Sequence, residues 1–468
     1  MSDRPTVVCI VLDTVRAQSL TSAFTPTIDG ILDRAVRFER AVAPSPWTAP
    51  SHAAMFTGLT TAEHGVNCVN QRFDPPVEPL PALFQNAGYH TIGVSNNPYI
   101  SREFGFDVGF DDFHDNPRFL YDDGLDLGTI AEGRALKYAD TARRVLTHDN
   151  PKKSIANVGY HLQQPADNGA DLSVERATRS AGESNPEFLF VNLMEAHAEY
   201  WPPQPYRRKH LAGDITDSAA RDVEQFHWAY LLGDEQPTDG KCQILRSLYR
   251  GAIAYLDSIV TRLRSEVYTD EEWKNTFLII LGDHGESFGE HGYFNHIGHV
   301  TQQTLHVPLI IAPPDGWWQS RSVETPVSLR LLYDICEAIA AGDGRSALER
   351  GLDSQVPPVA EYTGLQNDID HLAETYNVPE SELARYDQAR QATIVGKYIY
   401  VRNGKTADVV YRWGDTDSTY TPESVPDVTA RARKRLEDRL GPVEGYDLGE
   451  RSTVGSATEN RLEYLGYR

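Results

Sequence analysis

Short apolar runs alternate with amphipathic stretches along the first 345 residues, and two of these runs end in an acidic residue. TVVCIVLDT (6–14) is rich in β-branched residues and reaches Asp13, and NTFLIILGDHGE (275–286) is the most apolar run and reaches Asp283. Continuous apolar runs of this length predict parallel strands that are buried on both faces. Between them, FTPTIDGILDRAVRF (24–38) has helical spacing of its apolar residues, with Pro26 near its start.

Two further segments continue this alternation. PLPALFQNAGYHTIGVSNN (79–97) predicts a helix that stops at Gly88, followed by a strand from Tyr89 to Val94. PEFLFVNLMEAHAEYWPP (186–203) predicts a strand that runs into a loop. The pattern therefore predicts an α/β fold, in which helices cover both faces of a mostly parallel central sheet.

The rhythm changes in three places, which define the expected domain organisation. Residues 1–345 form the expected main domain, with polar insertions near 115–185 and 203–245 on its rim, where substrate selectivity often resides. Residues 346–468 form a smaller α+β subdomain. Within it, QATIVGKYIYVRNGKTADVVYRW predicts a hairpin around Asn403-Gly404, and VPDVTARARKRLEDRLG predicts a charged helix.

Composition excludes several classes of function. The net charge of −23 argues against a nucleic-acid partner, because phosphate binding needs a basic patch. The four cysteines are scattered without a CxxC pair, so they form neither a disulfide framework nor a zinc motif. No segment approaches the ~18 to 20 apolar residues that span a bilayer. The first apolar run is too short for a signal peptide, so we expect a cytoplasmic protein.

The basic residues are nine lysines and 35 arginines against 67 acidic residues. An acid-rich, lysine-poor composition suits concentrated salt, where repulsion between like charges is screened. A halophilic habitat is therefore a hypothesis, which complete folding and activity in salt-free buffer would contradict.

Candidate metal ligands stand where two apolar runs end. Asp13 follows the first run, and Asp283 with His284 follows the most apolar one. Carboxylate oxygens and an imidazole suit Ca²⁺, Mn²⁺, Mg²⁺ or Zn²⁺. Ligands gather at the carboxyl ends of parallel strands, so we expect one shared site there. Taken alone, Asp13 has an alternative role as the N-cap of a helix.

The stretch WTAPSHAAMFTG (47–58) raises the question of what Thr48 does. A threonine before proline makes a good helix N-cap, and that is the simplest interpretation of a lone threonine. A helix N-terminus also offers free N–H groups and partial positive charge to an anion. Held there beside a divalent cation, the Thr48 hydroxyl is a nucleophile directed at a sulfate or phosphate.

Several blocks in one order resemble the sulfatase family of the alkaline phosphatase superfamily over most of residues 5–312. They are VLDTVR, TPTIDGILDRAVRFERAVAPSPWTAPSHAAMFTG, HGV, AGYHTIGVSNN, FGFDVGFDDF, FVNLMEAHAEYWPP, and LGDHGESFGEHGYFNHIGH followed by HVPLII. The resemblance implies an α/β sandwich with a small C-terminal domain. It also implies that Thr48 stands at the nucleophile position of a Cys/Ser-x-Pro-Ser-Arg motif.

The same resemblance assigns roles to other positions. Asp13, Asp283 and His284 match metal ligands of the family, and the Thr48 oxygen faces the same ion. His197 matches a histidine that contacts the anion or the leaving group. Asn70, or alternatively Asn67, matches an asparagine that follows the HG turn, and we expect Asn70 to contact the substrate. One divalent ion is expected, and a second is less favoured.

The sequence also departs from the family pattern. Family members oxidise a cysteine or serine to formylglycine, but the threonine carbinol carbon bears a methyl group, so oxidation would give a ketone. His52 replaces the usual arginine, and we expect it to contact the substrate; Thr14 replaces the usual second aspartate. The usual lysine is missing from NHIGH, where His296 or His299 is left to contact the anion. A direct threonine nucleophile resembles the phosphodiesterase relatives, which form a phosphothreonine intermediate.

The combined prediction is a hydrolase of sulfate or phosphate esters in which Thr48 attacks and His197 or His299 protonates the leaving alkoxide. The substrate is expected to be a small-molecule or glycan ester. Two alternatives stay open: a transferase that passes the group to an alcohol, and a catalytically silent binding protein of the same fold. The anion, the natural ester and the oligomeric state stay open at this point.

Overall fold

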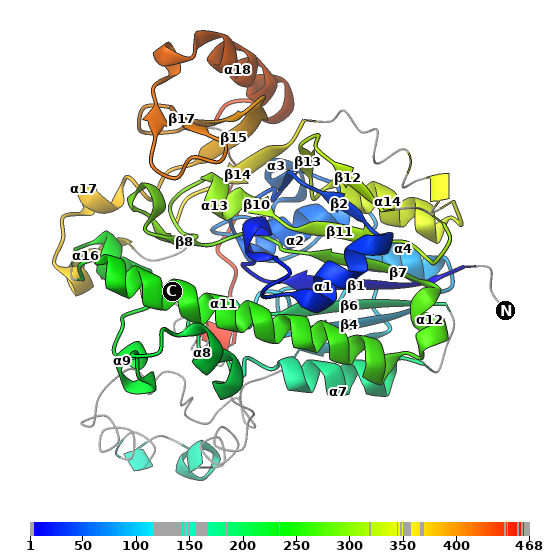
Figure 1. The fold of residues 1–468 in the computed structure, drawn as a ribbon. Coiled ribbons are helices and arrows are strands. Elements are labelled where there is room, and N and C mark those ends of the chain that lie inside the picture. The colour runs from blue at the N-terminus through cyan, green and yellow to red at the C-terminus, as the bar shows by residue number, and fades with distance from the viewer. Residues whose placement is uncertain are drawn as a thin grey trace.

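The fold was analysed in a computed structural model of the chain (Figure 1). It describes residues 4–115, 167–182, 186–233, 235–317, 320–343, 357–365 and 369–443, together with the short stretches 143, 146–147, 150–155, 345–346, 349, 446, 448–455, 458–459 and 462. Most of the expected insertion near 115–185 lies outside the described residues.

An eight-stranded sheet forms the centre of the molecule, in the order β12-β2-β11-β7-β1-β6-β4-β5. The strands are β1 (Thr6–Leu12), β2 (Val36–Phe38), β4 (His90–Ser95), β5 (Asp112–Asp115), β6 (Glu187–Leu193), β7 (Thr276–Leu281), β11 (Leu309–Ala312) and β12 (Arg321–Val323). β11 runs antiparallel to β7 and β2, and the other neighbouring pairs are parallel. The predicted mostly parallel sheet is confirmed.

Helices cover both faces of this sheet because side chains along each buried strand point alternately to the two sides. In β1, Val7, Cys9 and Val11 pack in the same core as α2 (Thr48–Thr57), α4 (Leu80–Asn86) and α14 (Leu331–Ala340). Val8, Ile10 and Leu12 pack in the other core with α1 (Pro26–Ile31), α7 (Ala170–Ser180) and α11 (Asp239–Arg262). In Figure 1, α1 and α11 lie on the side of the sheet that faces the viewer.

Shorter elements complete this part of the chain. The small strands are β3 (Ala41–Val42), β8 (Ser287–Phe288), β9 (Phe294–Asn295), β10 (His306–Val307) and β13 (Val327–Ser328). The short helices are α3 (Thr61–His64), α8 (Gln204–His210), α9 (Asp217–Arg221), α10 (His227–Leu231), α12 (Asp270–Lys274) and α13 (Gln302–Leu305). The expected insertion at 203–245 consists of α8, α9, α10 and the first turns of α11, and it adds no strand to the sheet.

The C-terminal part builds an antiparallel sheet of its own, in the order β14-β15-β16-β17-β18. Its strands are β14 (Val359–Tyr362), β15 (Arg390–Val395), β16 (Tyr398–Asn403), β17 (Val409–Arg412) and β18 (Thr419–Tyr420). The predicted charged helix is α18 (Pro426–Leu440), which packs on this sheet. α16 (Ile369–Tyr376) and α17 (Glu380–Leu383) connect β14 to β15.

The predicted hairpin needs a correction at its first strand. β16 and β17 do pair around the Asn403-Gly404 turn, but the run before it is folded into two strands. The chain reverses at Gly396, which has a φ of +61° that a residue without a Cβ adopts at low cost. A single glycine inside an apolar run was too weak a signal to predict this extra turn.

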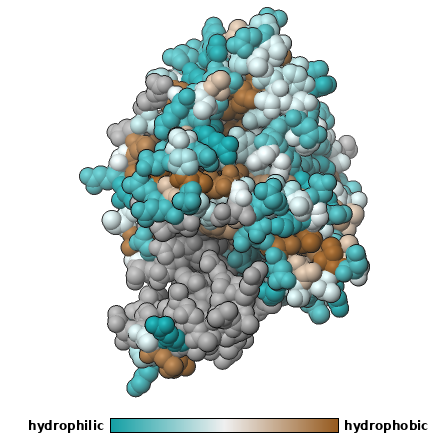
Figure 2. Space-filling view, turned by 90° about the vertical axis from the view of Figure 1, so that its left-hand side faces the viewer, coloured by the Kyte–Doolittle hydropathy of each residue, from teal (hydrophilic) through white to brown (hydrophobic). Residues whose placement is uncertain are grey.

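The face shown in Figure 2 is mostly hydrophilic and is interrupted by small hydrophobic areas. Within the described ranges, we find no helix that is long and apolar enough to cross a membrane.

Candidate functional site

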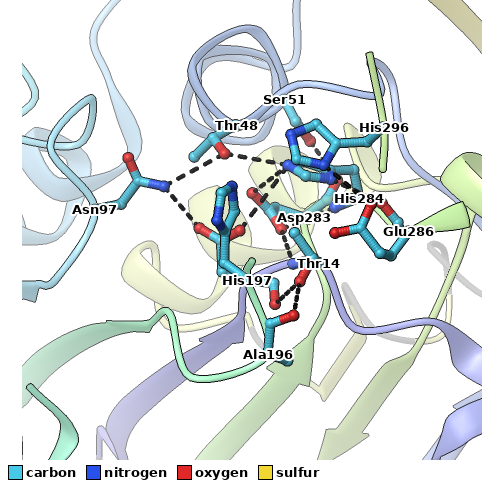
Figure 3. A network of polar contacts seen from close by, with 12 residues as sticks. Thr14, Thr48, Ser51, Asn97, Ala196, His197, Asp283, His284, Glu286 and His296 are labelled. Carbon is cyan, nitrogen blue, oxygen red and sulfur yellow. Dashed lines mark hydrogen bonds and ion pairs between the residues drawn. The ribbon is translucent and has the colours of Figure 1, made fainter. Parts of the chain in front are cut away.

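The carboxyl ends of β1, β4, β6 and β7 meet at one edge of the central sheet, and the candidate residues follow these ends directly (Figure 3). Asp13 follows β1, and the Asp283-His284 pair follows β7. Glycines flank this pair because the backbone is crowded there: a Cβ on Gly282 would lie 2.5 Å from the Val15 carbonyl, and one on Gly285 would lie 2.1 Å from that of Gln303. The GDHG sequence therefore fits where a bulkier residue would not.

Asp13, Asp283 and His284 converge as the sequence predicted. Their ligand atoms all lie within 4.8 Å of one another, and all three side chains are fully buried. Asp13 Oδ1 and Asp283 Oδ2 have no hydrogen-bond partner among the described residues. Two buried carboxylates that each leave an oxygen unpartnered are costly unless a cation neutralises them. The oxygen and imidazole donors and the unsatisfied oxygens therefore fit a divalent metal ion.

The raised pKa values of the two carboxyl groups also indicate a site for a cation. Burial raises the pKa of Asp13 to about 8, and the neighbouring Asp283 charge raises it further. Burial also raises the pKa of Asp283 to about 7, against hydrogen bonds from the His284 and Thr14 backbone that lower it. Without a cation the pair holds protons near neutral pH, so binding of a metal ion must displace protons from it.

Thr48 begins helix α2 but does not cap it. The N-cap is Trp47, and Thr48 is the first helical residue, which corrects the N-cap interpretation. Its Oγ1 lies 3.1 Å from His284 Nε2 and 3.4 Å from Asn97 Nδ2. The hydroxyl therefore faces the Asp13–Asp283–His284 group instead of the helix backbone, and it is 3% exposed.

The tautomer of His284 follows from its other ring nitrogen. Nδ1 lies 3.1 Å from the Gly285 carbonyl, which can only accept, so Nδ1 carries the proton. The lone pair of Nε2 then points towards Thr48 and the two carboxylates, as a metal-ligating histidine requires.

Asn97 is a site residue that the sequence analysis missed. It follows β4, and its Nδ2 donates to Asp13 Oδ2 at 2.8 Å as well as lying near Thr48. Asn97 therefore links the Asp13 carboxylate, which follows β1, to the Thr48 hydroxyl on α2. Its position after an apolar strand, in the sequence SNN, was the signal that could have identified it, by the same rule that identified Asp13.

Thr14 holds the loop after β1 in an unusual shape. Its φ of +60° is strained for a β-branched residue. Its N–H donates to Asp283 Oδ1 at 3.2 Å, and its hydroxyl lies 2.6 Å from the Ala196 carbonyl, which β6 leads to. The Thr14 side chain, at the position of the usual aspartate, therefore points away from the side chains of Asp13, Asp283 and His284 and links the β1 and β6 ends.

His52 lies behind the site instead of at its surface. Nδ1 lies 2.9 Å from the Thr48 carbonyl, and Nε2 lies 3.1 Å from the Asn192 amide. Burial lowers the pKa of His52 to about 3, so the ring is neutral. With both nitrogens bound to protein groups, His52 supports α2, and its predicted contact with substrate stays a prediction.

His197 and His296 stand beside the converged group. Their ring centroids are 5.3 Å apart, and that of His296 is 4.4 Å from that of His284. His296 Nδ1 lies 3.3 Å from Glu286 Oε1, and Glu286 accepts a 2.7 Å hydrogen bond from the Tyr200 hydroxyl. Figure 3 shows the rings of both histidines directed towards the space beside Thr48 and Asp283. Glu286 and Tyr200 were not predicted from the sequence.

The other two predicted residues have different surroundings. His299 bonds to Ser287 Oγ at 2.8 Å and to the Ile297 carbonyl at 3.0 Å, so its nitrogens do not face Thr48. Asn70 donates to the Gly65 carbonyl and contacts Ser452, and none of its described contacts reaches the Asp13–Asp283–His284 group. Their proposed catalytic and substrate roles stay predictions.

Comparisons with known proteins identify the family of the chain. A family model described as Sulfatase matches residues 5–339. "Uncharacterized sulfatase YidJ" of Escherichia coli is 23% identical over 342 residues, which is 69% of this chain but only 65% of that relative, slightly less than two thirds of its length. An N-acetylglucosamine-6-O-sulfatase of Bacteroides thetaiotaomicron is 22% identical over 415 residues, covering 78% of this chain and 68% of the relative.

The fold is shared with solved structures over almost the whole chain. The crystal structure of the phosphonate monoester hydrolase of Agrobacterium radiobacter superposes with a TM-score of 0.66 at 18% identity, covering 93% of this chain and 95% of that one. At this identity the likeness shows the architecture, including the small C-terminal sheet.

Proposed function

This chain belongs to the sulfatase family, and on that premise we propose that it is a metal-dependent hydrolase of sulfate or phosphate esters that uses Thr48 as its nucleophile. One observation carries the proposal: the Thr48 hydroxyl, at the start of α2, lies beside two buried carboxylates whose free oxygens fit a cation. A structural threonine at this point would bond to the helix backbone instead.

The metal ligands in this proposal are Asp13, Asp283, His284 and the Thr48 oxygen. A bound divalent ion supplies positive charge that lowers the pKa of a nearby hydroxyl and neutralises charge on the transferring group. That charge matters here, since the ion pairs of Asp13 and Asp283 within the described residues involve only histidines.

Each step of the proposed reaction is assigned to particular residues of the chain. Thr48 releases its hydroxyl proton to solvent, and its oxygen forms a bond to the sulfur or phosphorus while the bond from that atom to the alcohol oxygen breaks. The N–H groups of the first turn of α2 face the anion, and Asn97 fixes the direction of the hydroxyl. His197, whose Nδ1 is engaged with the Ala198 carbonyl at 2.7 Å, gives the leaving oxygen its proton. Water then cleaves the threonine ester, releases the anion and restores the hydroxyl.

The choice between sulfate and phosphate esters rests on two opposed features. Family membership favours sulfate esters, whereas a threonine, which cannot become formylglycine, favours phosphate esters. Parallel assays of an aryl sulfate, a phosphate diester and a phosphonate monoester, each with added Mn²⁺ or Ca²⁺, decide between them. We expect the protein to cleave at least one of these esters, and we expect a chelator to abolish that cleavage.

The same assays separate the alternatives. An added alcohol that captures the group in place of water would identify a transferase. The absence of cleavage of every ester, together with no bound divalent ion and no rise in melting temperature on adding one, would contradict the proposal and favour a binding protein.

Asn97 offers a sharp test of how the nucleophile is held. We predict that Asn97→Ala lowers kcat by about 10- to 100-fold, because the amide orients Thr48 and satisfies Asp13. Asn97→Asp should be worse, since it adds a carboxylate to a site that already holds Asp13 and Asp283. Steady-state kinetics on the best ester measure both effects.

The adjacent Asn96 supplies the matched control. Asn96 is as buried as Asn97, but its Oδ1 accepts a hydrogen bond from Ser173 on α7 and not from a residue of the candidate site. Asn96→Ala should keep kcat within about twofold after correction for folded protein. Equal losses in the two variants would show that Asn97 acts only through stability.

A further inference from the structure

A small cavity of about 90 Å³ lies between the C-terminal sheet and the loop that carries His296 and His299. It is lined by Arg385 after α17, Arg390 at the start of β15, and the rings of Tyr293 and Tyr411. Asn403 and Thr406, at the β16–β17 turn, complete its polar lining. We call this cavity the Arg385–Arg390 pocket.

Arg390 is a buried cation without a carboxylate partner in the described part of the chain. It is 5% exposed, and none of the ion pairs there involves it. Its guanidinium donates to the carbonyls of Arg385, Tyr386 and Gln388, which uses three of its five N–H donors. The nearby Asp387 carboxylate is directed to the Leu365 N–H and to Lys405. A buried, uncompensated charge is costly unless a counter-ion joins it.

Arg385 brings a second positive charge to the same cavity. The Arg385 side chain is more exposed than that of Arg390. Its Cζ lies 4.5 Å from the centre of the Tyr386 ring, and its guanidinium donates a hydrogen bond to the Leu231 carbonyl. It also makes no ion pair with a carboxylate of the described residues. In a chain with 23 excess negative charges, two arginines without a carboxylate partner in one pocket form an unusual concentration of positive charge.

The pocket is one aromatic ring away from the histidines of the site. Tyr293, which lines it, stacks on His299 with ring centroids 4.3 Å apart and planes 5° apart. The charge of Arg390 is among the causes that lower the pKa of His299, after burial. His299 in turn lies near His296, which contacts the His284 ring. The rings of Tyr293, His299 and His296 therefore form a series of contacts from the pocket to His284.

We propose that the Arg385–Arg390 pocket binds a second anionic group of the substrate, a carboxylate, sulfate or phosphate, so that the natural ester carries at least two negative groups. This rests on the proposed hydrolase function. A guanidinium offers parallel N–H donors that match an oxyanion, and two donors of Arg390 are left for this purpose. The tyrosine rings and the Asn403 and Thr406 side chains enclose the group.

The kinetic test compares an aryl ester that the enzyme cleaves with the same ester carrying a ring carboxylate. We expect wild type to prefer the carboxylated ester by about tenfold or more in kcat/KM, mainly through KM. Arg385→Gln and Arg390→Lys should reduce this preference to about threefold or less, while kcat/KM for the plain ester stays within about twofold. The control is Arg412→Gln, next to Tyr411 on β17, where alternation directs an exposed arginine to the other face.

A binding experiment tests the pocket independently of activity. Inorganic phosphate is titrated calorimetrically into Asp13→Asn protein with chelator present, which removes the proposed metal site, and into the same protein with Arg385→Gln added. We expect the second change to weaken phosphate binding by about tenfold. Phosphate binding that Arg385→Gln does not weaken would overturn the pocket, even if no ester is cleaved and the proposed function fails. Phosphate binding that depends on Arg385, combined with no preference between the two esters, would overturn the assignment to a substrate group.

Discussion

Thr48→Val should lower kcat for every ester that the protein cleaves by about 10⁴-fold or more, with the fold unchanged and Asp13, Asp283 and His284 still in place as metal ligands. Valine has nearly the shape of threonine and removes only the hydroxyl, which by our proposal forms the bond to sulfur or phosphorus. Because the hydroxyl makes no helix cap, its loss should leave α2 in place. Thr48→Ser should retain activity, since serine keeps an attacking oxygen at the same position.

The matched control is a second threonine of the same helix. Thr57 is also buried, but its hydroxyl donates to the Ala53 carbonyl one turn earlier. Thr57→Val should therefore cost some stability and keep kcat within about twofold. Quenched-flow samples of wild type, analysed by mass spectrometry, should carry the transferred group on the peptide that contains Thr48. Activity in Thr48→Val comparable to that of Thr57→Val would remove Thr48 from the mechanism.

The convergence of Asp13 with Asp283 and His284 could be predicted because all three residues follow the ends of strands. Asp13 and the Asp283-His284 pair stand directly after uninterrupted apolar runs, and such strands end at a common edge in a parallel sheet. Side chains that follow strand ends are positioned by the backbone, so little freedom remains. The same rule applies to Asn97, and it was missed because the strand before it, HTIGVS, is less apolar than TVVCIVL or TFLIIL.

The roles of the surrounding side chains could not be predicted, because they depend on which neighbour each one meets. His52 is one helical turn from Thr48, yet its ring turns back to the Thr48 carbonyl and to Asn192 from another strand. Glu286 is only two residues from His284, but its partners, Tyr200 and His296, come from separate loops. Spacing in the sequence carries no information on these long-range hydrogen bonds.

Asp13→Asn should abolish metal binding at this site and lower kcat by about 10³-fold or more, while it stabilises the metal-free protein. Asp13 is fully buried, is repelled by Asp283, and has one carboxylate oxygen without a partner. An amide removes the charge and keeps the shape. Metal content by mass spectrometry and melting temperatures with and without chelator measure the two effects.

The pH dependence has a definite sign. Burial raises the pKa of Asp13 from 3.8 to about 8, so the folded chain binds this proton more tightly than the unfolded chain does. The stabilisation from the protonated group is complete below pH 3.8 and is lost as the pH rises to about 8. Metal-free wild type should therefore lose stability over this window, and Asp13→Asn should lose less. Saturating metal should raise the melting temperature of wild type at pH 8 by about 5 °C and leave the variant unchanged.

Asp257 separates this effect from the general cost of changing a buried carboxylate. Its oxygens accept hydrogen bonds from the Thr27 and Ile28 N–H groups, at 3.0 and 2.9 Å, at the start of α1. Asp257→Asn should therefore destabilise the protein equally with and without metal, and it should keep the bound ion. If chelated Asp13→Asn melted below chelated wild type at pH 8, the two carboxylates would not be in electrostatic conflict. The proposal that Asp13, Asp283 and His284 bind a cation would then fail. It depends on repulsion between two buried carboxylates, each with an oxygen that lacks a partner, because a bound cation would relieve that repulsion.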